Sequence, residues 1–573
     1  MTDYDIAIVG LGPTGLTLAH LLGRHGLQVL VLEREPEFYG NARAVYTDDE
    51  ALRVFQTAGV ADEIHRDMNV DSAVQWITAD GTVLVQFREP SRRMWWPITN
   101  FLYQPYLETT LEQLLSRYQN VTVRRSREVT GFTDTGTHVA VDHAPTSGGG
   151  YGTAHGLVDT TKTEQVTASY LIGADGGRSV VRTALGIDMT GKSYPERWLV
   201  VDLKAKQGVD AFRHLPYFDF VCDPSMPTVS CPQPGGHHRF EFALTDDDDK
   251  QHFESDATVQ RLISRFVDTD QVEVKRRLVY TFNAVVADRW RQGRILLAGD
   301  AAHMTPQFIG QGMNAGIRDA DNLSWKLAAV LQQGADPALL DTYESERRPH
   351  AKAMIDLSVL NKSLVSEKSK VRAKCRDIGL KSALHIPGLA GWVRRAGMKP
   401  KPRFKRGAYF GLPRKPLRGI EGTLPPQPTM RTYDGKQIRL DDALGIGWTV
   451  IGFEIDPRDT LGDDVDAWSS IEATYATVYR AGHRPQGPTG DSSGRTGLVD
   501  LEDTEGILTR WLTKAGHQPG TLVVLRPDRY VFGAETDGQK LTHALTQLFR
   551  PGRRQSLPTT LPHSDRKSTR LNS

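Results

Sequence analysis

The chain has 573 residues, more than one hydrophobic core usually holds, so we expect two or three domains. Lys and Arg (70) nearly balance Asp and Glu (69), which argues against nucleic acid or an anionic membrane as a partner. The three cysteines, Cys222, Cys231 and Cys375, form no disulfide framework, which fits a reducing cytoplasm.

The chain opens with the pattern of a strand, a helix and a second strand, at Asp5–Val9, Leu16–Arg24 and Gln28–Leu32. A glycine-rich turn, Gly10–Gly15, joins the first strand to the helix. Its glycines allow a tight turn, a close approach of a pyrophosphate to the backbone, and close packing of the helix on the strand. The helix N-terminus attracts phosphate, and Glu33 can accept ribose hydroxyls, so the unit predicts a dinucleotide site.

From about residue 72 the pattern changes to strands with one helix among them. The expected strands are Val74–Thr78, Thr82–Phe87, Val121–Val123, His138–Val141 and Tyr170–Gly173, and the expected helix is Tyr106–Tyr118. The glycine-rich stretch Ser147–Gly156 predicts an exposed loop.

A second glycine-rich turn, Gly173–Ser179, follows the last of these strands, and Arg182 comes shortly after it. Asp175 stands beside two glycines at a strand-to-loop corner, where a carboxylate can reach a ribose or ribityl hydroxyl. An ordinary Asp-Gly turn is the alternative interpretation.

The segment from about 185 to 285 is rich in strands, including Arg239–Leu244 and Val272–Phe282. We interpret His237 and His238 as a pair in a loop. No carboxylate or cysteine stands near them at metal-binding spacing, so no metal site is predicted. The acidic run Asp246–Asp249 predicts a solvated turn.

The third turn follows a strand at Arg294–Ala298 and leads to a helix from about Gly312 to Gln333. Asp300 ends the strand, so its carboxylate can bind the ribityl chain of a flavin. The helix start can point at the N1/C2=O edge of the isoalloxazine ring, which carries negative charge when reduced. Together the three turns predict one FAD cofactor, provided that they meet in space.

Lys399–Pro428 is rich in Pro, Gly and basic residues and predicts a linker. A further unit at about 429–550 has strands at Trp448–Phe453 and Thr521–Leu525. The last ten residues have no periodic pattern and predict a disordered or non-native tail.

We therefore predict an α/β fold in which a Rossmann-like FAD-binding domain of the glutathione-reductase type is interleaved with a mainly β domain. The FAD-binding domain comprises residues 1–72, 100–190 and 285–360, and the substrate-binding domain comprises 73–99 and 191–284. Residues 361–428 form a helical segment and linker, 429–552 a C-terminal domain, and 553–573 a tail.

The three motifs, in this order and with these separations, resemble those of the single-component FAD-dependent aromatic hydroxylases, the class related to p-hydroxybenzoate hydroxylase and phenol hydroxylase. The resemblance covers about residues 1–360, and Tyr4–Val60 is similar in detail to the branch that hydroxylates 3-(3-hydroxyphenyl)propionate. Leu522–Gly533 resembles the thioredoxin-like C-terminal domain of many members. No cysteine follows Cys375, so dithiol chemistry is not expected there.

The resemblance implies ortho-hydroxylation of a phenolic acid, 3-(3-hydroxyphenyl)propionate, to its 2,3-dihydroxy product through a flavin C4a-hydroperoxide. The reaction would use O₂, with NADH or NADPH as a transient electron donor. Because Gly445-Ile446-Gly447 lacks a third glycine, we expect NAD(P)H to bind without a Rossmann domain of its own. A homodimer is left open.

The sequence and the resemblance together assign the site residues. The predicted cofactor-binding residues are Gly10, Gly12, Pro13, Thr14, Gly15, Glu33, Arg34, Arg43, Gln104, Asp175, Asp300, Gly312, Met313 and Asn314. The predicted catalytic residues are Pro306, Gln307 and Tyr217, and the predicted substrate-binding residues are Trp96, Tyr103 and Arg213. Many relatives have a second proline where this chain has Gln307; the Pro306 carbonyl is expected to face the reaction site, and His303 to position the backbone.

Three other functions stay open. A larger aromatic substrate, such as a polyketide or antibiotic, is the first. A non-catalytic flavin-fold binding protein is the second, and the intact Gly299-Asp300 run counts against it. A halogenase would need a lysine-bearing motif between flavin and substrate, which we do not find.

Overall fold

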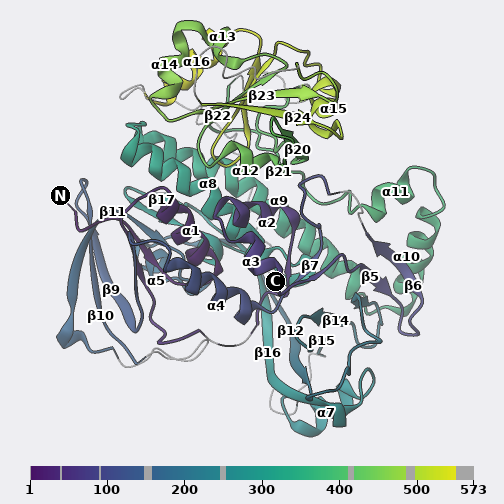
Figure 1. Cartoon of the computed structure of the whole chain (residues 1–573). Coiled ribbons are helices and arrows are strands. Elements are labelled where there is room, and N and C mark those ends of the chain that lie inside the picture. Colours follow the sequence, from purple (N-terminus) through teal and green to yellow (C-terminus); the bar gives the residue numbers. More distant parts are fainter. Residues whose placement is uncertain are drawn as a thin grey trace, which may run out of the picture.

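The computed structural model describes residues 2–38, 40, 42–88, 92–147, 158–244, 253–410, 419–485 and 497–549. Almost all of the predicted loop Ser147–Gly156, the whole acidic run Asp246–Asp249 and the predicted tail lie outside these residues. The described strands form sheets of eight, eight, seven and three strands, with helices around them. The fold is therefore mixed α/β (Figure 1).

The first sheet has a parallel centre with the strand order β17-β18-β11-β1-β2-β8. β1 pairs in parallel with β2 and β11, and β11 pairs in parallel with β18. The bounds are β1 Tyr4–Val9, β2 Val29–Leu32, β8 Val121–Arg124, β9 Arg127–Asp134, β10 Val139–Pro145, β11 Glu164–Gly173, β17 Arg291–Gln292 and β18 Ile295–Leu297. Because β1, β11 and β18 run side by side in the same direction, the turns that follow them emerge at one edge of the sheet.

The central strands are apolar without alternation because both faces of the sheet are covered. All residues of β2 and β18 are buried. Helix α1 packs against α8 and α4. The helices associated with this part are α1 Pro13–Arg24, α2 Asp49–Thr57, α3 Ala61–His65, α4 Gln104–Leu115, α5 Val180–Ala184, α8 Gly312–Gln332 and α9 Asp341–Val365.

The second sheet has the strand order β19-β16-β12-β15-β14-β13-β5-β6. Its bounds are β5 Val74–Ile77, β6 Val83–Phe87, β12 Met189–Ala205, β13 Phe218–Val221, β14 Thr228–Gln233, β15 His237–Ala243, β16 Val272–Ala287 and β19 His303–Met304. Helix α7 (Asp256–Ile263) covers one face, where it packs on Phe240 and Phe242. Side chains alternate along a strand, so Arg239 and Glu241 lie on the other face.

The prediction that His237 and His238 form a loop pair is wrong, because both lie in β15. The two residues point to opposite faces of the sheet, as consecutive strand residues must. The ring of His238 is buried and hydrogen-bonds the Ser230 hydroxyl at 2.9 Å.

A small three-stranded sheet consists of β3 (Tyr46–Thr47), β7 (Asn100–Phe101) and β4 (Asn69–Val70). In the sequence, these strands lie between strands of the two large sheets.

The C-terminal unit holds the seven-stranded sheet, at the top of Figure 1. Its strands are β20 Thr429–Thr432, β21 Gln437–Arg439, β22 Thr449–Phe453, β23 Thr474–Arg480, β24 Leu498–Asp503, β25 Leu522–Leu525 and β26 Val531–Glu535. Its helices are α12 Leu440–Leu444, α13 Pro457–Leu461, α14 Val465–Ser469, α15 Ile507–Lys514 and α16 Gly538–Leu548.

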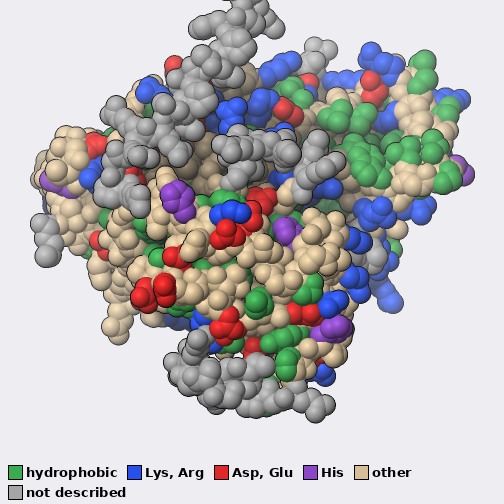
Figure 2. Space-filling model, turned by 90° about the horizontal axis from the view of Figure 1, so that it is seen from above, with side chains coloured by type: hydrophobic (Ala, Val, Ile, Leu, Met, Phe, Trp, Pro, Cys, Tyr) green, Lys and Arg blue, Asp and Glu red, His purple; other side chains and the backbone are tan. Residues whose placement is uncertain are grey.

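Two helices, α10 (Lys370–Ala383) and α11 (Leu389–Arg394), lie at one side of the molecule, where they contact β6. Figure 2 shows apolar and basic side chains gathered at that side. Val371, Ile378, Ile386 and Trp392 are exposed there. Among the residues that the structure describes, no helix has both the length and the apolar character needed to span a bilayer.

Candidate active site

The three glycine turns meet, which is the condition set by the sequence. A Cβ atom added to Gly10, whose φ is +101°, would lie 2.6 Å from the carbonyl oxygen of Ala174, so the first turn touches the second. A Cβ atom on Gly299, whose φ is +61°, would lie 2.6 Å from Oγ1 of Thr14, so the third turn touches the first. Neither glycine can be replaced without moving a neighbouring turn.

Arg182 joins the second turn to the third. Its Nη2 donates to the Gly177 carbonyl at 2.9 Å, and its Nη1 donates to the Ala301 carbonyl at 3.1 Å. Arg182 thus fixes the spacing of two turns.

Asp175 has protein partners on both carboxylate oxygens. Oδ1 accepts a hydrogen bond from the Ser179 hydroxyl at 2.6 Å, and Oδ2 accepts one from the backbone N–H of Val181 at 3.1 Å. Burial raises the pKa of Asp175, although these hydrogen bonds favour the charged form. The Asp175 carboxylate therefore accepts hydrogen bonds at the start of α5. Its predicted contact with the cofactor would have to use the remaining lone pairs of the same oxygens.

The first turn has the free space and the free N–H groups that a pyrophosphate needs. A Cβ atom on Gly12 would meet nothing within 4 Å, and Gly12 caps α1 without a side-chain hydrogen bond. Glu33 holds this turn, because its Oε2 accepts the N–H of Leu11 at 2.7 Å and its Oε1 accepts the N–H of Glu35 at 2.9 Å. Arg34 forms an ion pair with Glu35 at 3.1 Å.

The third turn leaves a carboxylate and a helix start for a ligand. The strand β18 ends at Leu297, earlier than predicted, and Asp300 is half-buried in the 3-10 turn Gly299–Ala301 that follows it. Within the described part of the chain, the Asp300 side chain has no hydrogen-bond partner. Helix α8 begins at Gly312 without a side-chain cap. The Asn314 amide donates to the Gly310 carbonyl at 2.9 Å, and its Oδ1 accepts the Thr47 hydroxyl at 2.8 Å.

These features together fit FAD. Two uncapped helix starts suit a pyrophosphate and the N1/C2=O edge of a flavin. The Asp300 carboxylate between them suits ribityl hydroxyls, because a charged acceptor forms strong hydrogen bonds with them.

Gln104 shapes the segment beside this site. Its Oε1 accepts the backbone N–H groups of Arg43 at 2.8 Å and Ala44 at 2.7 Å, and its Nε2 donates to Glu108 at 2.7 Å. The Arg43 side chain is exposed. Gln104 therefore positions the Arg43 backbone, and a direct flavin contact of Gln104 remains a prediction.

A buried network around Asp319 positions the third turn, and the sequence reasoning did not find it. The Asp319 carboxylate binds His303 Nε2 at 2.6 Å, the Gly299 N–H at 3.1 Å and Arg347 Nε at 2.8 Å. Burial raises the pKa of Asp319, but His303 and Arg347 outweigh it and lower the pKa to about 2. The ionised carboxylate thus holds the backbone that carries Asp300, and His303 takes part in positioning it.

The catalytic candidates Pro306 and Gln307 have definite partners. The Pro306 carbonyl accepts a hydrogen bond at 2.6 Å from the buried Ser358 hydroxyl of α9. The carbonyl oxygen that we expected to face the reaction site is therefore hydrogen-bonded to a helix. The Gln307 amide donates to the Glu241 carboxylate of β15. The segment before α8 is therefore fixed to α9 on one side and to the second sheet on the other.

Glu241 is the functional candidate that the sequence reasoning missed. It is 5% exposed, accepts the Tyr280 hydroxyl at 3.3 Å and lies 3.9 Å from Nη1 of Arg239. Burial raises the pKa of Glu241 to about 7, against the opposing effect of Arg239. The signal was present in the sequence, because Arg239-Phe240-Glu241-Phe242 alternates charged and aromatic residues and so places both charges on one face.

The predicted substrate-binding residues do not form one group. Tyr103 stacks on His237 with ring centroids 3.8 Å apart. Trp96 is a core residue whose indole N–H donates to Gln56 at 2.8 Å, and Arg439 of the C-terminal unit lies over its ring. Arg213 and the catalytic candidate Tyr217 are exposed.

A different set of aromatic rings lies at the third turn. Phe101 stacks on Phe218 with centroids 5.6 Å apart and lies 6.1 Å from the ring of Tyr46. A Cβ atom on Gly310 would lie 2.8 Å from Cδ1 of Tyr46. Tyr46 thus brings this aromatic row against the turn that precedes α8.

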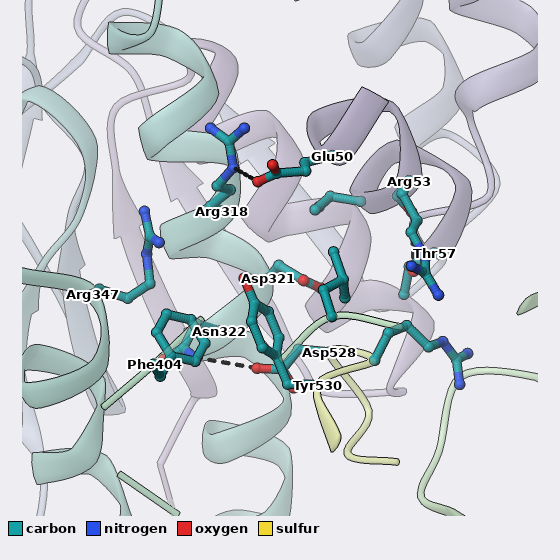
Figure 3. Close-up of a pocket in the computed structure, with 13 residues that line it drawn as sticks. Glu50, Arg53, Thr57, Arg318, Asp321, Asn322, Arg347, Phe404, Asp528 and Tyr530 are labelled. Carbon is teal, nitrogen blue, oxygen red and sulfur yellow. Dashed lines mark hydrogen bonds and ion pairs between the residues drawn. The ribbon is translucent and has the colours of Figure 1, made fainter. Parts of the chain in front are cut away.

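The hollow in Figure 3 is a seam rather than the active site. It lies between α2, α8 and the C-terminal unit, and none of the glycine turns lines it. Arg318 pairs with Glu50 at 2.9 Å, and Asn322 donates to Asp528 at 3.2 Å (Figure 3). Other charged side chains that line it pair with residues outside the lining: Arg53 with Asp441, Arg347 with Asp319 and Asp528 with Arg526.

Comparison with known proteins agrees with this geometry. The model of the FAD binding domain family matches residues 3–358, and the HcaD C-terminal domain model matches residues 422–551. A 3-(3-hydroxy-phenyl)propionate/3-hydroxycinnamic acid hydroxylase 2 from Burkholderia vietnamiensis is 37% identical over 548 residues, which cover 95% of this chain and 96% of the relative. The corresponding hydroxylase of a Mycobacterium species is 35% identical and covers 96% of this chain and 92% of the relative.

Solved structures share the fold. Aklavinone-11 hydroxylase in complex with FAD and aklavinone has a TM-score of 0.74 at 22% identity, and the alignment covers 96% of this chain and 99% of that one. The flavin-dependent monooxygenase PieE has a TM-score of 0.76 at 21% identity, with 96% and 100% covered. The match to the family model and the identity with the hydroxylases show that this chain belongs to the FAD binding domain family, as an FAD-dependent aromatic hydroxylase.

Proposed function

We propose that the chain hydroxylates 3-(3-hydroxyphenyl)propionate or a closely related phenolic acid to the 2,3-dihydroxy product, with NAD(P)H and O₂ as co-substrates. Relatives whose names state this activity are 35–37% identical over nearly the whole chain. The observation that carries the proposal is structural. Three glycine turns, two uncapped helix starts and the Asp300 carboxylate, which has no hydrogen-bond partner among the described residues, meet at one edge of the first sheet.

The proposed cofactor residues divide along the length of FAD. Gly10–Gly15 and the start of α1 would hold the pyrophosphate, Glu33 the adenosine ribose, Asp300 the ribityl chain, and Gly312–Asn314 the pyrimidine edge of the ring. When bound, the flavin supplies hydride acceptance and oxygen activation, and the protein supplies orientation and a dry site. Asp319 and Arg182 keep the turns at the spacing that this arrangement requires.

The substrate ring would lie between the third turn and the second sheet. The stacked rings of Phe101 and Phe218, with Tyr46 beside them, offer an apolar wall there. Such a wall excludes water, which favours coupling of oxygen activation to hydroxylation. Gln307 and Glu241 place polar groups at the same boundary, where they can meet the phenolic hydroxyl.

The domain division and the C-terminal fold are part of the proposal. The FAD-binding segments 1–72, 100–190 and 285–360 alternate with the substrate-binding segments 73–99 and 191–284, and the order of strands in the two large sheets supports this. Residues 429–552 form a thioredoxin-like domain, supported by the parallel pair β22–β23 beside the antiparallel β25–β26. A cytoplasmic location is supported by three cysteines that form no disulfide.

The test is turnover by the purified holoenzyme. Oxidation of NADH or NADPH should accelerate with 3-(3-hydroxyphenyl)propionate or 3-hydroxycinnamate, and the product should gain 16 Da and carry a catechol. The matched control, 3-phenylpropionate, lacks the hydroxyl and should give no hydroxylated product. Turnover of a polycyclic aromatic but of no phenolic acid would overturn the proposed substrate class.

A further inference from the structure

We propose that Glu241 accepts the proton of the substrate's phenolic hydroxyl, while Gln307 and Tyr280 hold the carboxylate in place. This inference rests on the proposed function and names the group that completes the site.

The position of Glu241 follows from strand alternation in β15. Phe240 and Phe242 point into the core beneath α7, so Glu241 points to the opposite face of the sheet. On that face it meets Gln307, which is 66 residues away in sequence and stands between Pro306 and the start of α8. Glu241 is therefore a carboxylate through which the second sheet contacts the turn that precedes α8.

The hydrogen bonds around Glu241 suit a proton acceptor. Gln307 and Tyr280 both donate to Oε2, and the side chains of both donors are half-buried. Burial raises the pKa of the Tyr280 hydroxyl well above its usual range, so this group stays protonated and keeps donating. The carboxylate can thus gain a proton without losing its orientation.

The charges near Glu241 largely cancel one another. On its own strand, Arg239 is held by Asp202 of β12 at 2.7 Å, and Arg276 of β16 lies 3.6 Å from the same aspartate. From β14, Cys231 is buried, and burial raises the pKa of its thiol, which keeps it neutral. Arg239 is thus shared with Asp202, and burial governs Glu241, whose pKa rises to about 7. A base with a pKa near the working pH combines ionisation with a useful affinity for a proton.

The proton balance is simple. The phenolic O–H bond breaks, the proton forms a new O–H bond on the Glu241 carboxylate, and the electron pair stays on the phenolate oxygen. The phenol and the Glu241 carboxylate together keep one negative charge before and after the transfer, so no charge is added to the buried site. The phenolate has more electron density at its ortho carbon, where the proposed hydroxylation takes place.

Binding of an ionised probe tests the inference without turnover. The probe is 3-(3-hydroxy-4-nitrophenyl)propionate, whose phenolate is coloured and largely formed in solution at pH 8. It is added to the FAD-loaded enzyme without NAD(P)H, and proton exchange is measured by calorimetry in two buffers of different ionisation enthalpy. A phenolate bound beside an ionised Glu241 would repel it, so the wild-type enzyme should take up about one proton while the bound probe stays coloured.

Two variants locate that proton. Glu241→Gln keeps the shape without the charge and should bind the coloured probe with no proton uptake. Asp219→Asn is the matched control, because Asp219 lies on the opposite face of the same sheet, is also buried and also has a pKa raised to about 7 by burial. It should behave like the wild type. The flavin spectrum of each variant reports that the site is intact.

The outcomes separate the inference from the proposed function. Equal proton uptake by the wild type and Glu241→Gln, wild-type binding without uptake, or a colourless bound probe would each overturn the role of Glu241. Failure of the probe to bind the wild-type holoenzyme would count against the proposed substrate class and remove the inference with it. With the natural substrate, Glu241→Gln should lower the hydroxylation rate by about 100-fold, typical for loss of a general base.

Discussion

Asp300 is the residue whose role can be tested most directly, because the fold gives its carboxylate no partner in the described part of the chain. Asp300→Ala should weaken FAD binding by about 1.5–3 kcal/mol, roughly 10- to 150-fold, since ribityl hydroxyls lose a charged acceptor. The measurement is FAD titration, together with FAD retention on gel filtration. Glu33→Ala is the comparison and should weaken binding less, because both Glu33 carboxylate oxygens already accept backbone N–H groups and have fewer lone pairs left for a ribose. An effect of Glu33→Ala as large as that of Asp300→Ala would reverse this ranking.

At the residue scale, roles that depend on neighbours in the sequence could be predicted, and roles that depend on residues distant in the sequence could not. Gly10 and Gly299 were recognisable because a glycine-rich turn after a buried strand has few other uses. Glu241 and Asp319 were not, because their roles depend on Gln307 and His303, which reach them only in the fold. Trp96 shows the converse, since an aromatic residue in a strand-rich segment proved to be a core residue.

At the scale of elements, the contact between α1 and α8 gives a sharp prediction. A Cβ atom on Gly316 of α8 would overlap Oγ1 of Thr14 in α1 and would lie 3.2 Å from the Cα of Gly299. Gly316→Ala should therefore push α8 away from α1 and lower the stability by about 1–3 kcal/mol, as overpacking does. The melting temperature of the apoprotein measures this effect separately from FAD binding.

The matched control for that prediction is Gly379→Ala in α10. A Cβ atom there meets nothing within 4 Å, so only helix propensity changes. Alanine is favoured over glycine in a helix interior by about 1 kcal/mol, so this variant should be slightly more stable than the wild type. Equal melting temperatures for the two variants would show that α1 and α8 are not in close contact.

The elements that were predicted correctly have strong periodic patterns. The strands that became β1, β2 and β18 are short buried runs, and α8 begins within a recognisable motif. The 17-residue strand β12 was not predicted, because its first half is mostly exposed and polar and its order comes from pairing with β16. Pairing between strands far apart in sequence leaves no local signal.

At the scale of the whole molecule, the mixed α/β fold class could be inferred from the alternation of elements, but the attachment of the C-terminal unit could not. One part of that attachment is Glu346 of α9, a buried residue within a helix that the sequence reasoning did not single out. Its carboxylate accepts from both Nη atoms of Arg526 at 2.9 Å, from Lys326 at 2.8 Å and from the Ala408 N–H at 2.9 Å. Several chain segments therefore depend on one charge.

Glu346→Gln should destabilise the protein by about 3–5 kcal/mol, because it removes the carboxylate that pairs with the buried Lys326 and leaves Arg526 with Asp528 as its counter-charge. Asp356→Asn on the same helix is the control, since its pair with Lys352 is exposed and worth at most about 0.5 kcal/mol. Urea unfolding followed by tryptophan fluorescence measures both, and Trp325 stands next to Lys326 in this seam. If Glu346→Gln lowers the free energy of unfolding no more than Asp356→Asn does, the attachment of the C-terminal unit does not depend on the Glu346 charge.

The pH dependence gives the same prediction a second readout. Burial raises the pKa of Glu346, but Arg526 and Lys326 outweigh it and lower the pKa to about 2. A carboxylate with a depressed pKa stabilises the folded state fully above its unfolded pKa of about 4.3, and this stabilisation is lost as the pH falls toward 2. The stability difference between the wild type and Glu346→Gln should therefore shrink as the pH falls below about 4.5. A difference that grows on acidification would mean that Glu346 is protonated in the native protein, and Lys326 would then lack its carboxylate partner, while Arg526 would keep Asp528.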